Sequence, residues 1–277
     1  MTPPLRFCLI GQSVMQSPSA AMHNAALSAS GIVGRYENRD VPPNALSGFV
    51  AELRAGRYRG CNVTIPYKAV MASMCDQLDG DAELLRAVNT VTVDSGRLIG
   101  DNTDVDGFEL GLSAERMWPL PGSAAVVIGA GGAAAAVVLS LARVPVTRVT
   151  VAARQAEAAA ELARRLAPVA AVDTVEWKRD PLLKRMRSAA IVVNATPAGL
   201  RDLPFHPREL PTSCTVADVR YRPRPIELVE AARATGHRAC DGFEMLVHQG
   251  MLSLARWTGL PPQWGVARQA MLRALTA

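Results

Sequence analysis

The chain has 277 residues, a formal net charge of +5 and an isoelectric point near 9.2, with 49% hydrophobic and 20% charged residues. This is the composition of a globular protein long enough to bury one large core or two smaller ones. The basic excess is spread along the sequence without interleaved aromatic residues, so it argues against nucleic-acid binding and favours small anionic ligands.

Short apolar runs alternate with helical stretches over the first hundred residues. The patterns predict strands over 6–11, 60–65 and 89–93 with a return strand at 98–100, and helices over 19–30 and within 43–57. Strands that alternate with helices are typical of a mainly parallel α/β layer.

The segment Trp-Pro-Leu-Pro-Gly at 118–122 is the clearest linker. Beyond it the sequence predicts a strand, a glycine turn and a helix within 124–142, followed by strand 149–152, helix 155–166, and strands 190–193 and 215–218. This run of βα units predicts a second, doubly wound domain. The last stretch, 240–277, has a helical pattern and is expected to return to the first domain.

The five cysteines are an odd number without a Cys-x-x-Cys pair, so we predict neither a disulfide framework nor a metal site. The N-terminus lacks the apolar core of a signal peptide. Residues 124–142 carry no charge, but Gly-Ala-Gly-Gly interrupts them, which argues against a membrane span. We therefore predict a cytoplasmic protein.

A glycine motif follows the strand at 124–128. It fits the pattern G-x-G-x-x-G/A between a strand and a helix, and its residues are Gly129, Ala130, Gly131, Gly132, Ala133 and Ala134. The first glycine permits a tight turn, and the second lets the backbone approach a pyrophosphate. The helix that follows offers free N–H groups to the phosphates. The motif predicts a dinucleotide site.

The end of the next strand indicates which dinucleotide. An Asp or Glu there is typical of NAD sites, because it accepts hydrogen bonds from the ribose hydroxyls. This strand ends in Ala152-Ala153-Arg154, and an arginine can bind a 2′-phosphate. NADP is therefore favoured over NAD; the alternative is a solvated surface arginine.

Three stretches of the first domain place polar side chains at strand ends: 17–19, 62–68, and 89–90 with 100–104. They supply hydroxyls, amides, one lysine and one aspartate. A polyhydroxylated acid needs such groups, because each of its hydroxyls must be paired once water is expelled. The residues by themselves thus predict a dinucleotide-dependent enzyme with a polar pocket.

The motifs also carry a resemblance that spans essentially the whole chain. In content, order and spacing the chain resembles the shikimate dehydrogenase family in the segments NVTIPYK (62–68), AVNT (87–90), GDNTD (100–104), GAGGA (129–133), NATPAG (194–199), DVRYRP (218–223) and DGFEMLVHQG (241–250).

The resemblance implies a role for each matching residue. Lys68 and Asp104 would be the catalytic pair at the reacting oxygen. The substrate would be bound by Ser17, Ser19, Asn62, Thr64, Asn89, Tyr221 and Gln249. The cofactor would be bound by Gly129, Ala130, Gly131, Gly132, Ala133, Arg154, Asn194, Ala195 and Thr196.

The resemblance also implies a fold and a reaction. We expect a substrate-binding catalytic domain over 1–104, a Rossmann NADP-binding domain over 105–238, and C-terminal helices over 239–277 packed on the substrate domain. The implied reaction is the reversible NADP-dependent reduction of 3-dehydroshikimate to shikimate, in the pathway to aromatic amino acids. The expected partner is a small carboxylate, without nucleic acid or membrane, and the expected assembly is a monomer or homodimer.

Four positions depart from the family pattern. Ala20 stands where the family has a proline after the two serines, and Ala158 stands where it has a second basic residue. Ile226 stands where a Thr-Pro pair is common, and Glu244 stands where a glycine is common. The loss at Ala158 leaves NAD use open. The changes at Ile226 and Glu244 leave the substrate open. The alternatives are a quinate or related dehydrogenase that uses NAD and, less favoured because Lys68 and Asp104 are retained, a non-catalytic dinucleotide-binding regulator.

Overall fold

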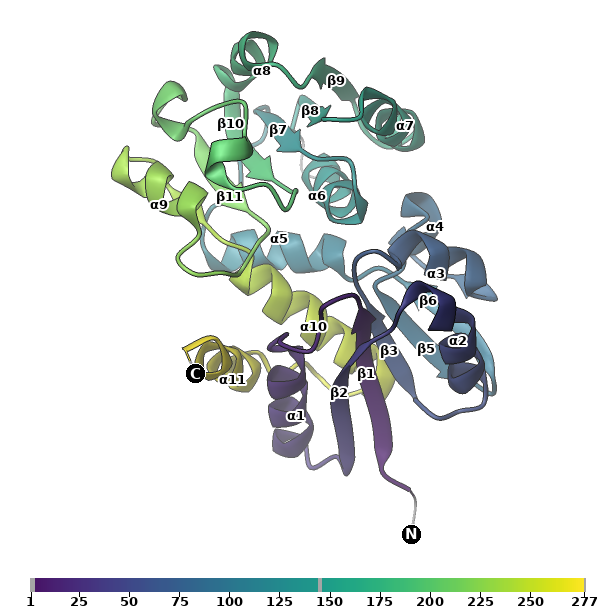
Figure 1. Ribbon diagram of the computed structural model, residues 1–277. Helices are drawn as coiled ribbons and strands as arrows, with labels where there is room; N and C mark the ends of the chain where they lie inside the picture. The colour runs from purple at the N-terminus through teal and green to yellow at the C-terminus, as the bar shows by residue number, and fades with distance from the viewer. Residues whose placement is uncertain (1–2, 144–145, 277) are drawn as a thin grey trace. The chain divides into compact units, whose positions relative to one another are not determined.

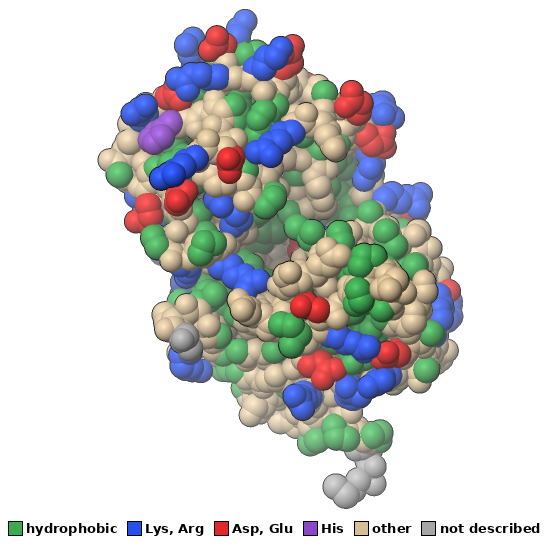
Figure 2. Space-filling model, in the orientation of Figure 1, with side chains coloured by type: hydrophobic (Ala, Val, Ile, Leu, Met, Phe, Trp, Pro, Cys, Tyr) green, Lys and Arg blue, Asp and Glu red, His purple; other side chains and the backbone are tan. Residues whose placement is uncertain are grey.

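A computed structural model describes residues 3–143 and 146–276, which divide into two compact units. Unit 1 consists of residues up to Thr103 and from Val247 onward, and unit 2 is the continuous segment Asp104–Leu246. In the described residues no helix combines the length and the apolar character needed to cross a bilayer. On the face drawn in Figure 2, basic and acidic side chains are interspersed.

Unit 1 is built on a six-stranded sheet. In chain order its elements are β1 (Leu5–Gly11), α1 (Ser19–Ala29), β2 (Gly34–Asp40), a 3-10 turn (Pro43–Ala45), α2 (Leu46–Arg54), β3 (Gly60–Val63), α3 (Lys68–Met74), β4 (Gln77–Leu78), α4 (Asp81–Leu85), β5 (Thr90–Asp94), β6 (Arg97–Asp101), part of α10 (Phe243–Thr258) and α11 (Trp264–Thr276). The strand order is β2-β1-β3-β5-β6-β4, and β3 and β6 pair with β5 antiparallel while the other pairs are parallel.

Alternate residues of β1 face the two sides of this sheet, as the two-residue repeat of a strand requires. Cys8 and Ile10 join a buried cluster with side chains of α2 and α3. On the other side Phe7 stacks on Trp257 of α10, with ring centroids 5.1 Å apart. Figure 1 shows α1 beside α11, away from α2 and α3.

Unit 2 is built on a second six-stranded sheet, and every strand pair in it is parallel. Its elements are α5 (Asp104–Ala114), β7 (Ala124–Ile128), α6 (Gly132–Arg143), β8 (Arg148–Ala153), α7 (Ala156–Leu166), β9 (Val172–Glu176), α8 (Arg179–Met186), β10 (Ala189–Asn194), 3-10 turns at Leu200–Asp202 and Pro207–Glu209, β11 (Thr215–Asp218), α9 (Glu227–Ala234), β12 (Ala239–Cys240) and the first turn of α10.

The strand order of unit 2 is β12-β11-β10-β7-β8-β9. This is a doubly wound sheet whose direction of winding reverses between β7 and β10, so it has a topological switch point there. Val126 and Ile128 of β7 pack with side chains of α8 and α9, whereas α6 lies against β7 and β8. The predicted fold class, an α/β layer plus a Rossmann domain, is confirmed.

The structure adds detail to the predicted segments. Helix α5 begins at Asp104 itself, and residues 239–240 form β12 beside β11, so unit 2 extends to Leu246. The return strand at 98–100 is part of β6, which a two-residue turn at Ser95-Gly96 joins to β5. Both turn residues have positive φ, of 51° and 82°, as a tight hairpin requires.

Candidate active site

The two predicted carboxylate-binding serines lie together at the start of α1. The Ser17 and Ser19 hydroxyl oxygens are 2.9 Å apart, and the Ser19 N–H donates to Ser17 Oγ at 3.3 Å. The N-cap residue of this helix is Pro18, which has no side-chain acceptor. Because Asn38 donates to the Ser17 carbonyl at 2.7 Å, the turn is held from β2 as well. Two hydroxyls and the positive end of an eleven-residue helix thus point to an anion site.

Asn89 is the centre of a polar cluster in unit 1. Its Nδ2 donates to Gln249 Oε1 at 3.1 Å and to Thr103 Oγ1 at 2.9 Å. Its Oδ1 accepts from the Thr103 N–H and the Thr90 hydroxyl, both at 2.8 Å. Three of the predicted motifs therefore meet at one buried amide, although Asn89 and Gln249 are 160 positions apart.

Asn62 lies in the same cluster, with its polar side-chain atoms engaged by the protein. Its Oδ1 accepts from the Tyr36 hydroxyl at 2.8 Å, and its Nδ2 donates to Ser253 Oγ at 2.9 Å and to the Asn89 carbonyl at 3.1 Å. Ser253 is itself 2.7 Å from Thr90 Oγ1. In this structure the Asn62 side chain therefore holds other members of the cluster in place by hydrogen bonds.

His23 connects the serine turn to α10. Its Nδ1 lies 2.8 Å from the Ser19 carbonyl, and its Nε2 lies 3.1 Å from the Gly250 carbonyl. The imidazole stacks on Tyr36 with centroids 3.9 Å apart. Complete burial lowers the pKa of His23 from 6.5 to about 4, so the ring is neutral at pH 7 and can donate to only one of the two carbonyls.

The remaining predicted substrate-side residues are divided between the units. Thr64 and Lys68 belong to unit 1, where Thr64 is half-buried after β3 and Lys68 is the first residue of α3. Asp104, which is buried, and the half-buried Tyr221 belong to unit 2. A carboxylate at the first position of α5 is favoured by the helix dipole, whereas a lysine at the first position of α3 is disfavoured by it.

Unit 2 contains a cavity of about 600 Å³ at the carboxyl ends of β7 and β8. Its walls are formed by Gly129, Ala130, Gly131, Ala153, Arg154, Gln155, Ala158, Trp177, Thr196, Pro197, Ala198 and Asp202. Five of the predicted cofactor residues are among them: Gly129, Ala130, Gly131, Arg154 and Thr196. Ligands of doubly wound sheets bind at this edge, beside the switch point.

Two glycines shape one wall of the cavity. Gly129 has a φ of +116°, and a Cβ there would lie 2.9 Å from Thr196 Cγ2 and 3.0 Å from the Ala195 carbonyl. At Gly131 a Cβ would meet nothing within 4 Å. The first glycine is therefore required by the turn, and the second leaves room for a ligand. Gly132 then starts α6, whose first N–H groups favour phosphate.

Asn194 shapes the turn opposite these glycines. Its Oδ1 accepts from the N–H and hydroxyl of Thr196 at 3.1 and 2.7 Å, and its Nδ2 donates to the Ala198 carbonyl at 3.2 Å. Nδ2 also donates to Asp218 at 3.0 Å, and Asp218 is paired with Arg220 at 2.7 Å. The buried Asn194 side chain thus holds the turn that forms this wall of the cavity. Thr196, which lies on the turn, lines the cavity.

Arg154 follows β8 directly and is exposed on the cavity wall. Its guanidinium carbon lies 5.6 Å from the centroid of the Trp177 ring. Sequence reasoning missed Trp177, since a lone tryptophan beyond a polar edge strand carries no motif. Reasoning also missed Tyr36 and Ser253, whose hydrogen bonds to Asn62 cross 26 and 191 positions.

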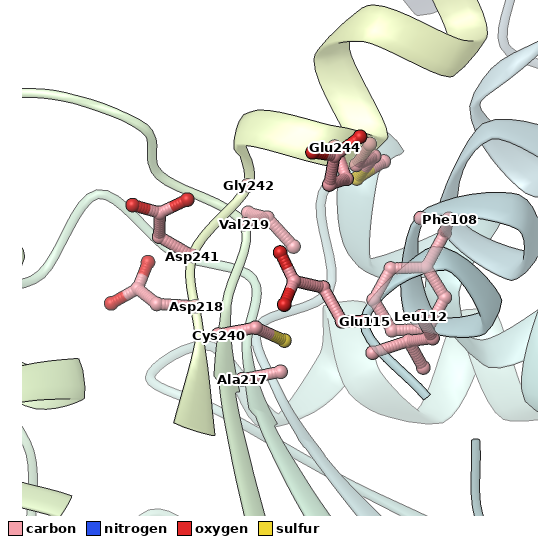
Figure 3. Close-up of a pocket in the computed structure, with 12 residues that line it drawn as sticks. Phe108, Leu112, Glu115, Ala217, Asp218, Val219, Cys240, Asp241, Gly242 and Glu244 are labelled. Carbon is pink, nitrogen blue, oxygen red and sulfur yellow. The ribbon is translucent and has the colours of Figure 1, made fainter. Parts of the chain in front are cut away.

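A second, small hollow lies at the carboxyl ends of β11 and β12 (Figure 3). Phe108 and Leu112 line it from α5, Cys240 and Gly242 line it from the other side, and Glu244 stands above it on the first turn of α10. Burial, with Glu115 and Asp241 nearby, raises the pKa of the Cys240 thiol to about 12.

The described residues include no group of three or more His, Cys, Asp or Glu suited to a metal.

A cavity with a glycine turn at a switch point and a polar cluster on a second α/β unit are the two parts that a dinucleotide-dependent oxidoreductase needs. Comparison with known families agrees. The shikimate dehydrogenase substrate binding domain matches residues 9–91, the shikimate / quinate 5-dehydrogenase domain matches 112–201, and the shikimate 5′-dehydrogenase C-terminal domain matches 242–275.

Full-length relatives extend this result. The chain is 40% identical to the shikimate dehydrogenase (NADP(+)) of Symbiobacterium thermophilum, over 96% of this chain and 93% of the relative. The Thermus thermophilus shikimate 5-dehydrogenase, solved with NADP(H) and shikimate, is 37% identical, with a TM-score of 0.87 over 98% of this chain and 100% of that one. The Corynebacterium glutamicum quinate dehydrogenase, solved with NAD, is 31% identical, with a TM-score of 0.88 over 98% and 99%. The chain belongs to the shikimate dehydrogenase family, as the motifs predicted.

Proposed function

We propose that this chain catalyses the reversible NADP-dependent reduction of 3-dehydroshikimate to shikimate. The observation that carries the proposal is the 40% identity, over 96% of the chain, to a shikimate dehydrogenase (NADP(+)). Arg154 beside the glycine-walled cavity supports NADP, because a cation stands where NAD sites place a carboxylate. Residues Gly129 to Ala133 and the turn Asn194–Thr196 would hold the cofactor there.

The substrate carboxylate would bind at Ser17 and Ser19. Their mutual contact at 2.9 Å uses one hydroxyl hydrogen and leaves the other free for the carboxylate; the first can also turn to the carboxylate, which is the stronger acceptor, if the mutual hydrogen bond is given up. The dipole of α1, which begins at Ser19, would favour the same anion.

The ring hydroxyls would be held by Thr64, Gln249 and Tyr221, with Asn62 and Asn89 setting the positions of their neighbours. Asn89 fixes Gln249 Oε1 by a bond of 3.1 Å, and Asn62 fixes Ser253 by one of 2.9 Å. Direct contact of substrate with Asn62 and Asn89 would require exchange of these hydrogen bonds.

The nicotinamide, when bound, supplies or accepts the hydride at the carbon that bears the reacting oxygen. In the direction of reduction the Lys68 ammonium would donate a hydrogen bond, and then a proton, to that oxygen as negative charge develops on it. Asp104 would orient the ammonium and stabilise its charge. In the direction of oxidation the same pair would remove the hydroxyl proton.

The test is the rate of formation of reduced cofactor with shikimate or quinate, each combined with NADP or NAD. We expect the highest kcat/KM with shikimate and NADP. A purified, folded chain that turns over none of the four combinations would overturn the proposal.

The second function is oxidation of quinate with NAD. Ala158, which lines the cavity where relatives offer a second basic residue, favours NAD, and the Corynebacterium glutamicum structure provides a full-length precedent. A higher kcat/KM with quinate and NAD would establish this function instead. A cytoplasmic location and a monomeric or homodimeric assembly stay predictions from the sequence.

A further inference from the structure

The wall of the dinucleotide cavity carries an aromatic ring that the proposed function leaves without a role. Trp177 directly follows β9, lines the cavity and is half-buried. It also packs against the buried cluster formed by β7, β10, α8 and α9. The ring is therefore anchored to the core of unit 2 while its other side faces the ligand space.

The contact of Trp177 with Arg154 is a cation–π interaction. The guanidinium carbon is 5.6 Å from the ring centroid, within the range in which such contacts are attractive. Among the described residues no carboxylate forms an ion pair with Arg154, although Asp202 lines the same cavity. A guanidinium supported on its face keeps its in-plane N–H groups for hydrogen bonds, and these match the oxygens of a phosphate.

The contact between Trp177 and Arg154 matters here because Ala158 supplies no second cation. It lines the cavity from the first turn of α7, and its methyl group offers the phosphate nothing. Arg154 is thus left as the one cation on the described cavity wall. A free arginine side chain loses rotamer entropy when it binds, and an arginine already held in place loses less.

We propose that Trp177 is a positioning residue for cofactor specificity: it holds Arg154 at the cavity wall so that one arginine suffices to select the 2′-phosphate. The inference rests on the proposed use of NADP. It differs from direct stacking of Trp177 on the adenine ring, because NADP and NAD share the adenine and differ only in the 2′-phosphate.

The experiment measures equilibrium binding of NADPH and NADH by calorimetry, so that it is independent of turnover. In Trp177→Leu we expect the Kd for NADPH to rise about tenfold and the Kd for NADH to stay within twofold. Trp177→Phe, which keeps an aromatic face, should bind NADPH within about threefold of the wild type. Thermal denaturation confirms that each variant is folded.

A double-mutant cycle isolates the pair. In an Arg154→Ala background, Trp177→Leu should change NADPH binding no further. In the Trp177→Leu background, Ala158→Arg should restore NADPH affinity by providing a second cation. Equal weakening of NADPH and NADH in Trp177→Leu, or no weakening of either, would overturn the inference. Failure of the wild-type chain to bind NADPH more tightly than NADH would instead overturn the proposed use of NADP.

Discussion

The polar cluster of unit 1 and the dinucleotide cavity of unit 2 are built by opposite means. Six of the twelve residues that line the cavity are glycine or alanine, and a Cβ at Gly131 would meet nothing within 4 Å. The cluster is made of side chains that bind one another, such as Asn89 with Gln249 and Asn62 with Ser253. Added volume should therefore be the most damaging change at the glycine turn of the cavity, whereas removal of a side-chain group should be the most damaging change on the substrate side.

The largest expected effect is on kcat, when the proposed proton donor Lys68 of unit 1 is removed. Lys68→Ala should lower kcat by about 100- to 10,000-fold, because the proton donor is lost. The Kd for NADPH should be unchanged, since the cavity lies in unit 2. Lys184→Ala, an exposed lysine of α8, is the matched control for loss of a positive charge. A kcat like that of the wild type in Lys68→Ala would remove the residue from the mechanism.

The cavity is tested by added volume at two neighbouring glycines. Gly129→Ala should destabilise the fold by about 4 kcal/mol, because positive φ strain and a clash with the turn at Ala195 add up. Gly131→Ala should leave stability within about 0.5 kcal/mol of the wild type. It should nevertheless raise the Kd for NADPH at least tenfold, because its methyl group enters the ligand space. Thermal denaturation and calorimetry separate the two effects, and tight NADPH binding by Gly131→Ala would place the pyrophosphate elsewhere.

His23 makes the stability of unit 1 depend on pH. Its pKa is lowered by burial to about 4 from 6.5, so the unfolded chain binds more protons between these values. Stability should therefore be full above pH 6.5 and fall by about 3 kcal/mol as the pH drops through 4. The stacked Tyr36 phenol stays neutral in this window, because burial raises its pKa. In His23→Gln, the difference in unfolding free energy between pH 7 and pH 4 should shrink by that amount; an unchanged slope would contradict the assignment.

The smallest expected effect on activity comes from Ser253, which supports the polar cluster of unit 1. Ser253→Ala removes a hydroxyl that contacts Asn62, Thr90, Thr103 and the Gln249 carbonyl. Each of these groups keeps another partner, so we expect a net cost of about 1 kcal/mol. Because Asn62 keeps the Asn89 carbonyl, the fold should survive, and KM for shikimate should rise by a few fold with kcat nearly constant. Ser73→Ala, an exposed serine of α3 that bonds only its own helix, is the matched control. A fall in kcat without a change in KM would argue against a positioning role.

The same contrast explains what the sequence predicted. The inner strands β7, β10 and β11 are apolar runs and were located well, as was the glycine turn after β7. The edge strands β2 and β9 were not found, because their sequences GRYENRD and VDTVE are polar. An edge strand is only partly covered, and charged residues there discourage pairing with other chains, so the apolar signal is weak. The edge strands β4 and β12 have two residues each, too few for any periodicity.

Within the site, local chemistry was predictable and long-range chemistry was not. Ser17 and Ser19 are near one another in sequence and in space, and Gly129 and Gly131 form one local motif. The partners of Asn62 could not be found in this way, because Tyr36 and Ser253 acquire their roles only when β3 lies beside β1 and α10 packs on the sheet. The sequence patterns assigned no role to His23, whose contacts with the Ser19 and Gly250 carbonyls join two parts of the site that are 231 positions apart.

The covering of β1 by α10 sets an order of events during synthesis of the chain. Phe7 is made 250 positions before its partner Trp257, which also donates to the Val91 carbonyl at 3.0 Å. Unit 2 is continuous, so all of it leaves the ribosome before that tryptophan does. The unit that is begun first is therefore completed last, and until then only α1 covers the face of its sheet on which Phe7 lies. A chain shortened before α10 would keep the strands of both sheets and still leave Phe7 exposed to aggregation or to chaperones.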